Sequence, residues 1–265
     1  MSVARTYLRL FGVQLRISAA SAMAYRANFL IEGVFGVGWS FLTLLPLIVV
    51  YGARPSFNGW DFASALVVMA YFQALHAIME GLVGPSLQDL VERIRSGSFD
   101  YVLLKPADAQ AIVSASRCEP WKIFDFAIAI GIAIYAFWYR GVAPGAADIA
   151  LGIALFVAGA LAMYSLWIAC AALAFWVGRL DNLINLLSAI FDTARWPVLV
   201  FPGAWRLVFT FVIPIALMTT FPAMGLLGVL GLKQLLGTLA GTLLMLIASR
   251  LVWRAAIRSY TSASS

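Results

Sequence analysis

Charge is scarce in this chain. Only 11% of its 265 residues are charged, whereas 63% are hydrophobic and the mean hydropathy is +0.94. A soluble domain of this length needs far more charge to cover its surface, so the soluble fold classes are excluded. The composition predicts an all-α polytopic membrane protein, because a helix satisfies its own backbone hydrogen bonds inside lipid.

Histidine and cysteine are nearly absent as well. His76 is the only histidine, which excludes a histidine triad and a multi-histidine metal centre. Cys118 and Cys170 lie far apart and outside any CxxC pattern, which argues against a disulfide or a cysteine metal site. The phosphate-loop pattern GxxxxGK[ST] is missing too, since the run from Gly228 to Lys233 has the wrong spacing. We therefore expect no catalytic residues, no metal and no ATP site of this kind in the chain.

The charges that are present favour one sign, with 18 basic and 12 acidic residues. In a membrane protein this excess indicates cytoplasmic loops rather than a nucleic-acid partner. Within residues 1–28, Arg5, Arg9 and Arg16 fall on one side of a helical wheel, and leucines fill much of the rest. We interpret this segment as an amphipathic cytoplasmic helix lying on the lipid surface. The alternative is a basic leader before the first span.

Long apolar stretches fill most of the chain, and a span needs about 20 such residues. Seven stretches approach this length, and they are 29–51, 62–84, 121–139, 148–177, 180–202, 207–231 and 233–254. Both ends of the chain are basic, with Arg250, Arg254 and Arg258 near the C-terminus, so both ends are expected in the cytoplasm. An even number of crossings follows. The sequence therefore predicts six transmembrane helices in a single domain, 1–265.

One of the seven stretches should then fail to cross. Residues 203–231 contain Pro214, Pro222 and four glycines, and prolines break helices. We interpret this segment as a re-entrant helical hairpin on the outer side, before the sixth span. In the rival map 207–231 crosses, and 180–202 is a cytoplasmic helix. Its charge distribution is almost as good, so charge leaves both maps open.

A polar segment at 85–120 separates the second and third spans. Its apolar residues recur at the i, i+3, i+4, i+7 spacing that indicates one face of a short helix, namely Leu87, Leu90, Val91 and Ile94. Ser86 is placed to cap the start of this helix, and Gly97 to end it in a left-handed conformation. Lys105-Pro106 closes the segment, and a second short helix is expected from Ala107 to Arg117.

The run Gly97, Phe99-Asp100 and Leu103-Leu104-Lys105-Pro106 resembles the loop after the second span in permeases of the ABC-2 type exporter family. The start of the first span at Tyr25–Phe29 and the late prolines at Trp196-Pro197, Phe201-Pro202 and Phe221-Pro222 are similar to the same family. The resemblance implies a coupling helix between spans two and three, and it favours the re-entrant map. It assigns the coupling role to Leu87, Leu90, Val91, Arg93, Ile94, Arg95, Gly97, Phe99, Asp100, Lys105 and Pro106.

The resemblance also implies partners. These are separate ABC ATPase subunits, which bind ATP and Mg, and a second permease that is the same or a related chain. Such proteins lie in the plasma membrane of bacteria, the inner membrane where there are two, and export their substrates. The chain itself is then a permease and not an enzyme.

A few polar residues fall inside the expected spans, where charge is costly. His76 and Glu80 share one helical face, and Asp192 and Arg195 are three residues apart. Each pair is either a structural contact or part of a transport pathway. A pathway role would suit an ion-gradient-driven secondary transporter, but the inverted repeats typical of that class are not visible. A lipid-modifying membrane enzyme would need clustered catalytic side chains, which are also missing.

Overall fold

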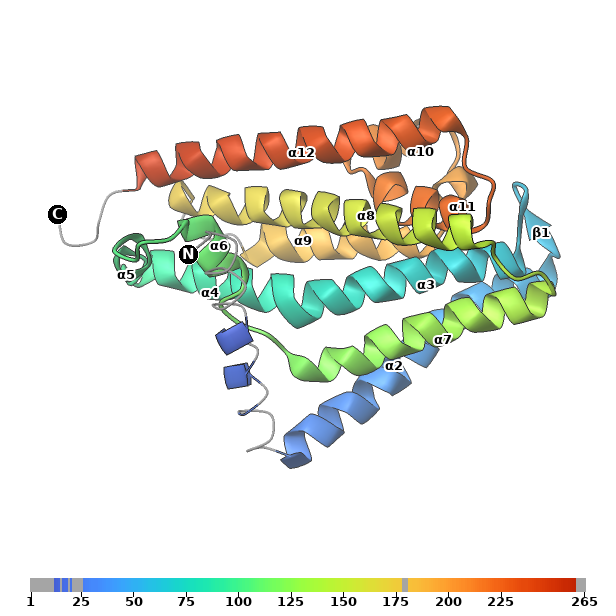
Figure 1. Ribbon diagram of the computed structural model, residues 1–265, viewed down its shortest axis with the longest axis horizontal. Helices are drawn as coiled ribbons and strands as arrows, with labels where there is room; N and C mark the ends of the chain where they lie inside the picture. Colours follow the sequence, from blue (N-terminus) through green and yellow to red (C-terminus); the bar gives the residue numbers. More distant parts are fainter. Residues whose placement is uncertain (1–11, 15, 19, 21–25, 178–180, 261–265) are drawn as a thin grey trace.

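The computed structural model describes residues 12–14, 16–18, 20, 26–177 and 181–260. Within them the protein is a bundle of helices with one short β-hairpin (Figure 1). Among the described residues, five helices are long and apolar enough to cross a membrane, and they are Phe29–Ala53, Phe62–Arg95, Pro120–Arg140, Ala146–Phe175 and Leu232–Ser259. The predicted all-α polytopic membrane class is confirmed at this level. The expected amphipathic helix over 1–28 lies mostly outside the described residues.

The bundle has two distinct ends. The end at the left of Figure 1, here called the loop end, contains α4 (Gly84–Arg95), α5 (Asp100–Leu103) and α6 (Ala109–Ser114). The opposite end, here called the hairpin end, contains strands β1 (Ser56–Phe57) and β2 (Trp60–Asp61), with α10 (Gly203–Leu207) and α11 (Phe221–Leu226). The long helices between the two ends are α2 (Arg26–Ala53), α3 (Phe62–Ile78), α7 (Ile123–Arg140), α8 (Ala146–Ala172) and α12 (Leu232–Ser259).

Helix α3 is the centre of the bundle. The apolar window of the Phe62–Arg95 helix is 78% buried, against 17% for each of the spans formed by α2 and α12. Its buried alanines, among them Ala65, Ala70 and Ala74, leave room for close neighbours, and its most extensive contact is with α7. The outer helices instead expose leucines and other large apolar side chains, as helices facing lipid do. Asp61 starts α3 by accepting a hydrogen bond from the Ser64 amide at 3.1 Å.

The sequence predicts a separate coupling helix after the second long helix. The structure has no such separation. The second long helix runs unbroken from Phe62 to Arg95, through a π-helical turn at Met79–Val83, and α4 is its continuation. Pro85 has no amide hydrogen, so the Gly81 carbonyl is freed inside the helix. The Glu119 amide donates to that carbonyl at 2.7 Å, which removes the cost of the proline. Ser86 therefore caps nothing, and its hydroxyl donates to the Arg117 carbonyl.

The two disputed segments form shorter pieces. The stretch 180–202 contains α9 (Asp181–Phe191), a 3₁₀ turn at Asp192–Arg195 and another at Val198–Val200. The stretch 203–231 contains α10, π-helical turns at Val208–Val212 and Ala216–Thr220, and α11. Its longest apolar helix is Ala216–Leu226, which is well short of the roughly 20 residues of a span.

Close packing holds the 203–231 segment against α8. A Cβ atom added at Gly159 would lie 2.7 Å from the Met218 carbonyl oxygen. Only glycine therefore allows this approach of the two backbones. Thr219 and Thr220 are fully buried here, and their hydroxyls bond the backbone of residues 194 and 198.

Candidate functional site

The loop that follows α4 makes a tight turn. Gly97 has φ +73°, the left-handed conformation that the sequence analysis predicted for it. The Phe99 amide then donates to the Arg93 carbonyl at 3.0 Å, which folds the chain back onto the end of α4. Helix α5 starts at once, so residues 96–106 form a compact unit rather than an extended loop.

Phe99 is fully buried inside this chain. Its ring makes edge contacts with Phe175 at 5.2 Å, Tyr260 at 5.4 Å and Trp253 at 6.4 Å between centroids. We call these four residues the aromatic cluster. They join the loop to the end of α8 and to the last turns of α12. Its own chain therefore covers the ring, and the coupling role that the resemblance assigns to Phe99 stays a prediction.

The apolar stripe of α4 is also turned inward. Leu87, Leu90 and Val91 are 2%, 0% and 7% exposed, and Ile94 is half-buried. Because α4 continues α3, its apolar face packs on α6, α8 and the turn Leu173–Phe175. The stripe is therefore covered by this chain's own helices. A role of the segment in coupling stays a prediction.

The outer surface of the loop is exposed instead. We call it the tip, and it consists of Tyr101, Leu103, Leu104, Lys105 and Pro106. Tyr101 is 70% exposed and Leu104 79%, although both are large and apolar. Arg95 is exposed beside them, and Asp100 is half-buried. Burial and a hydrogen bond with the Asp100 carboxylate raise the pKa of Tyr260 in the aromatic cluster.

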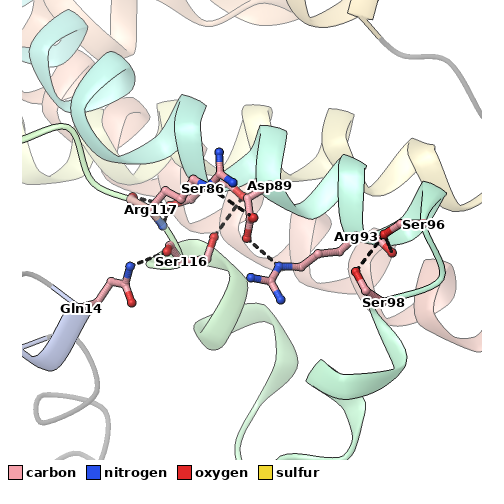
Figure 2. Close-up of polar contacts among 8 residues, drawn as sticks. All are labelled: Gln14, Ser86, Asp89, Arg93, Ser96, Ser98, Ser116 and Arg117. Atoms are coloured by element: carbon pink, nitrogen blue, oxygen red, sulfur yellow. Dashed lines mark hydrogen bonds and ion pairs between the residues drawn. The ribbon is translucent and has the colours of Figure 1, made fainter. Parts of the chain in front are cut away.

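A polar network binds α4 to the segment before α7 (Figure 2). Asp89 is 8% exposed, and its carboxylate accepts from Arg93 Nε at 2.6 Å and lies 3.4 Å from Arg117 Nε. The Ser86 hydroxyl accepts from the Arg117 amide at 3.2 Å. Gln14 donates to the Ser116 carbonyl, so the N-terminal segment reaches the same network. Arg93 thus serves this internal network, and the coupling role that the resemblance assigns to it stays a prediction.

A second tie joins α6 to α12. Arg250 donates to both Asp108 oxygens and, at 2.6 Å, to the Gln110 side-chain oxygen. This guanidinium holds the pKa of Asp108 below its usual range. Asp108 also caps α6 by accepting from the Ala111 amide at 3.2 Å. The loop end is therefore fixed to α12 by charge as well as by the aromatic cluster.

A cavity of about 740 Å³ lies among α2, α3, the start of α7 and α9, and we call it the polar cavity. All four polar residues that the sequence analysis singled out line it, and they are His76, Glu80, Asp192 and Arg195. The Asp192–Arg195 pair is 3.5 Å apart, and the Arg195 guanidinium lies 5.5 Å from the centre of the Phe72 ring. No local pattern in the sequence indicates that the two pairs line the same cavity.

A chain of polar contacts runs along the wall of this cavity. Gln73 donates to the Ser40 hydroxyl at 2.7 Å, and that hydroxyl donates to Asp125 at 3.1 Å. Lys122 donates to Asp125 at 3.1 Å and also to Glu80, which lies 3.6 Å from His76. The chain links α2, α3 and α7. Ser40 and Gln73 were missed in the sequence analysis, although each is an isolated polar residue in an apolar stretch.

Comparison with known proteins gives one match. The family model described as ABC-2 family transporter protein matches residues 37–264. No curated protein and no solved structure matches the chain.

Proposed function

Since the chain belongs to the ABC-2 transporter family, we propose that it is the permease subunit of an ATP-driven exporter. It forms the substrate pathway with a second permease, the same or a related chain, and works with separate ATPase subunits. The family supports a membrane permease that partners ABC ATPases. The sequence lacks a phosphate loop, which supports a separate ATPase subunit as the place where ATP and Mg bind.

The observation that carries this proposal is the exposed tip at the end of an over-long helix. The Phe62–Arg95 helix has 34 residues, and about 50 Å of helix exceeds the roughly 30 Å hydrocarbon core. Its charged residues lie towards the Arg95 end, so this is the end that projects into water. Exposed Tyr101 and Leu104 there suit docking to a soluble protein, because aromatic and apolar side chains are favoured in interface cores.

The packing supports a mechanical connection, in which movement of the tip passes along α4 and α3 to the polar cavity. The aromatic cluster and the Asp89 network fix the tip to α4, α8 and α12. Helix α4 continues into α3, which presents Phe72, Gln73 and His76 to the polar cavity. Closure of the ATPases would push the tip, tilt this helix and reshape the cavity. In this scheme Leu87, Leu90 and Phe99 transmit the movement, and the tip receives it.

The proposed topology has six crossings, with the loop end in the cytoplasm of a bacterium and the hairpin end outside. Helix α9 and the turns that follow it complete the fifth crossing, and 203–231 is re-entrant from the outer side. The rival map would place Arg206 on the cytoplasmic side, whereas Arg206 donates to the Leu199 carbonyl, which also accepts from Asn58 of the β-hairpin, and this supports the re-entrant map. Basic residues at the loop end support the orientation, among them Arg95, Lys105, Arg117 and Arg258.

Co-purification with a co-expressed ABC ATPase subunit tests the proposal. We expect the wild-type permease to retain the ATPase and the Tyr101→Ala/Leu104→Ala variant to release it, because both side chains are exposed docking groups. Trp138→Ala is the matched control, since Trp138 is 75% exposed on the membrane helix α7. Equal ATPase retention by all three proteins would remove the docking role from the tip.

An ion-gradient carrier is the second candidate function. The titratable contacts of His76, Glu80 and Lys122 beside the polar cavity favour it. Transport that continues without any ATPase and stops when a protonophore collapses the gradient would support this alternative instead.

A further inference from the structure

The polar cavity carries an excess of negative charge. Its lining includes four carboxylates and two cations, and these residues are Glu32, Glu80, Asp125, Asp192, Lys122 and Arg195. Lys122 faces both Glu80 and Asp125, and Arg195 faces Asp192. Two negative charges are thus left without a cation when His76 is neutral. Glu32 is exposed and Asp192 keeps much of its side chain accessible, so the excess negative charge attracts an occupant of the opposite charge.

Glu32 is the carboxylate with most freedom to meet that occupant. It makes no ion pair within the described part of the chain and lines the cavity from α2. Asp192, on the α9 side, keeps 48% of its side chain exposed despite its pairing with Arg195. The other two carboxylates are held in the Lys122 contacts. A cation in the cavity therefore meets Glu32 on one wall and Asp192 on the other.

Aromatic rings complete the lining. Phe35 and Trp39 lie near Glu32 on α2 and are 72% and 66% exposed, and Phe72 lies on α3. The faces of such rings attract organic cations and cover their apolar parts. Arg195 already lies over Phe72 in this way. A volume of about 740 Å³ is in the range of sites for drug-sized molecules.

A metal ion is a poorer fit than an organic cation. Among the described residues, no three His, Cys, Asp or Glu side chains come together as metal ligands do. We infer that the polar cavity binds an amphipathic organic cation, with Glu32 and Asp192 as its charge partners and Trp39 as its aromatic contact. This inference rests on the proposed permease function, for which it names the substrate class.

The test compares two probes of the same shape and opposite charge, tetraphenylphosphonium and tetraphenylborate. Equilibrium dialysis uses the full chain in nanodiscs of phosphatidylcholine, with empty nanodiscs as the blank. We expect saturable binding of the phosphonium alone. No saturable phosphonium binding, or borate binding of equal strength, would overturn the inference without the need for any variant.

Variants then locate the site. Glu32→Gln should weaken phosphonium binding about tenfold, the effect of losing one favourable charge contact. Glu32→Asp, which keeps the charge, should retain it, and Trp39→Leu should weaken it. Glu92→Gln is the control, because this carboxylate is 71% exposed on α4, outside the cavity. Unchanged binding in Glu32→Gln would refute the site even if the wild type prefers the phosphonium.

This assay needs no ATPase, so its outcome is separate from that of the proposed function. If the wild-type chain binds phosphonium but retains no ATPase, the binding site is supported and the exporter function is refuted. If the chain retains the ATPase but binds the phosphonium and the borate equally, the exporter function is supported and this substrate class is refuted.

Discussion

Phe99 and Tyr101 are two residues apart, yet their side chains have different surroundings and different expected roles. Phe99 is buried in the aromatic cluster, whereas Tyr101 is 70% exposed. We expect Phe99→Ala to lower the free energy of unfolding by about 3–5 kcal/mol, because it leaves a cavity. Tyr101→Ala should leave stability unchanged and weaken ATPase retention. Thermal unfolding of the purified variants, beside co-purification, separates the two roles, and equal melting temperatures would contradict the assigned burial of Phe99.

The Asp108–Arg250 pair predicts a dependence on pH. The pKa of Asp108 is lowered by its bond to Arg250, so the ionised pair adds stability above the unfolded-state pKa. That contribution is lost as the pH falls through the lowered folded-state pKa of Asp108. We expect Asp108→Asn to melt at a lower temperature than wild type at pH 7, and the difference to shrink as the buffer is made more acidic. A constant difference over the whole range would show that the charge of Asp108 is not involved.

At the scale of elements, the 203–231 segment is tied to the β-hairpin. The Leu199 carbonyl accepts from Arg206 at 2.9 Å and from Asn58 at 3.3 Å, so both side chains lie at the hairpin end. Cysteine placed at either position should therefore react with an impermeant maleimide from the same side of the membrane. Labelling of Arg206→Cys only from the side opposite to Asn58→Cys would favour the rival map, in which 207–231 crosses.

The apolar stripe of α4 could be covered either by a partner or by the chain's own helices. The stripe of Leu87, Leu90 and Val91 was correctly predicted to be one helical face, and the structure buries it. Periodicity shows that such a face needs a cover, but it does not identify the cover. Here the cover is α8 and α6, because α4 grows directly from α3. Pro85 does not break this helix, because the Glu119 amide donates to the Gly81 carbonyl that the proline leaves free.

At the scale of the whole molecule, the loop end collects the parts that the proposal places in the cytoplasm. Helix α12 ends there, and its Trp253 contacts Phe99, so the end of α12 and the tip belong to one side. We expect a Ser262→Cys variant to react with an impermeant reagent only after cells are permeabilised, and Asn58→Cys to react in intact cells. Labelling of Ser262→Cys in intact cells, with the protein correctly inserted, would reverse the topology.

The sequence by itself determined the membrane class, the long spans, the left-handed turn at Gly97 and the interrupted 203–231 segment. Each depends on local chemistry: apolar runs of sufficient length, a residue without a Cβ, and prolines that cannot donate. The tertiary structure alone decided that Phe99 faces inward and that His76, Glu80, Asp192 and Arg195 share one cavity with Ser40 and Gln73. These contacts join helices far apart in the chain, and no local pattern specifies which distant helix will cover a given face.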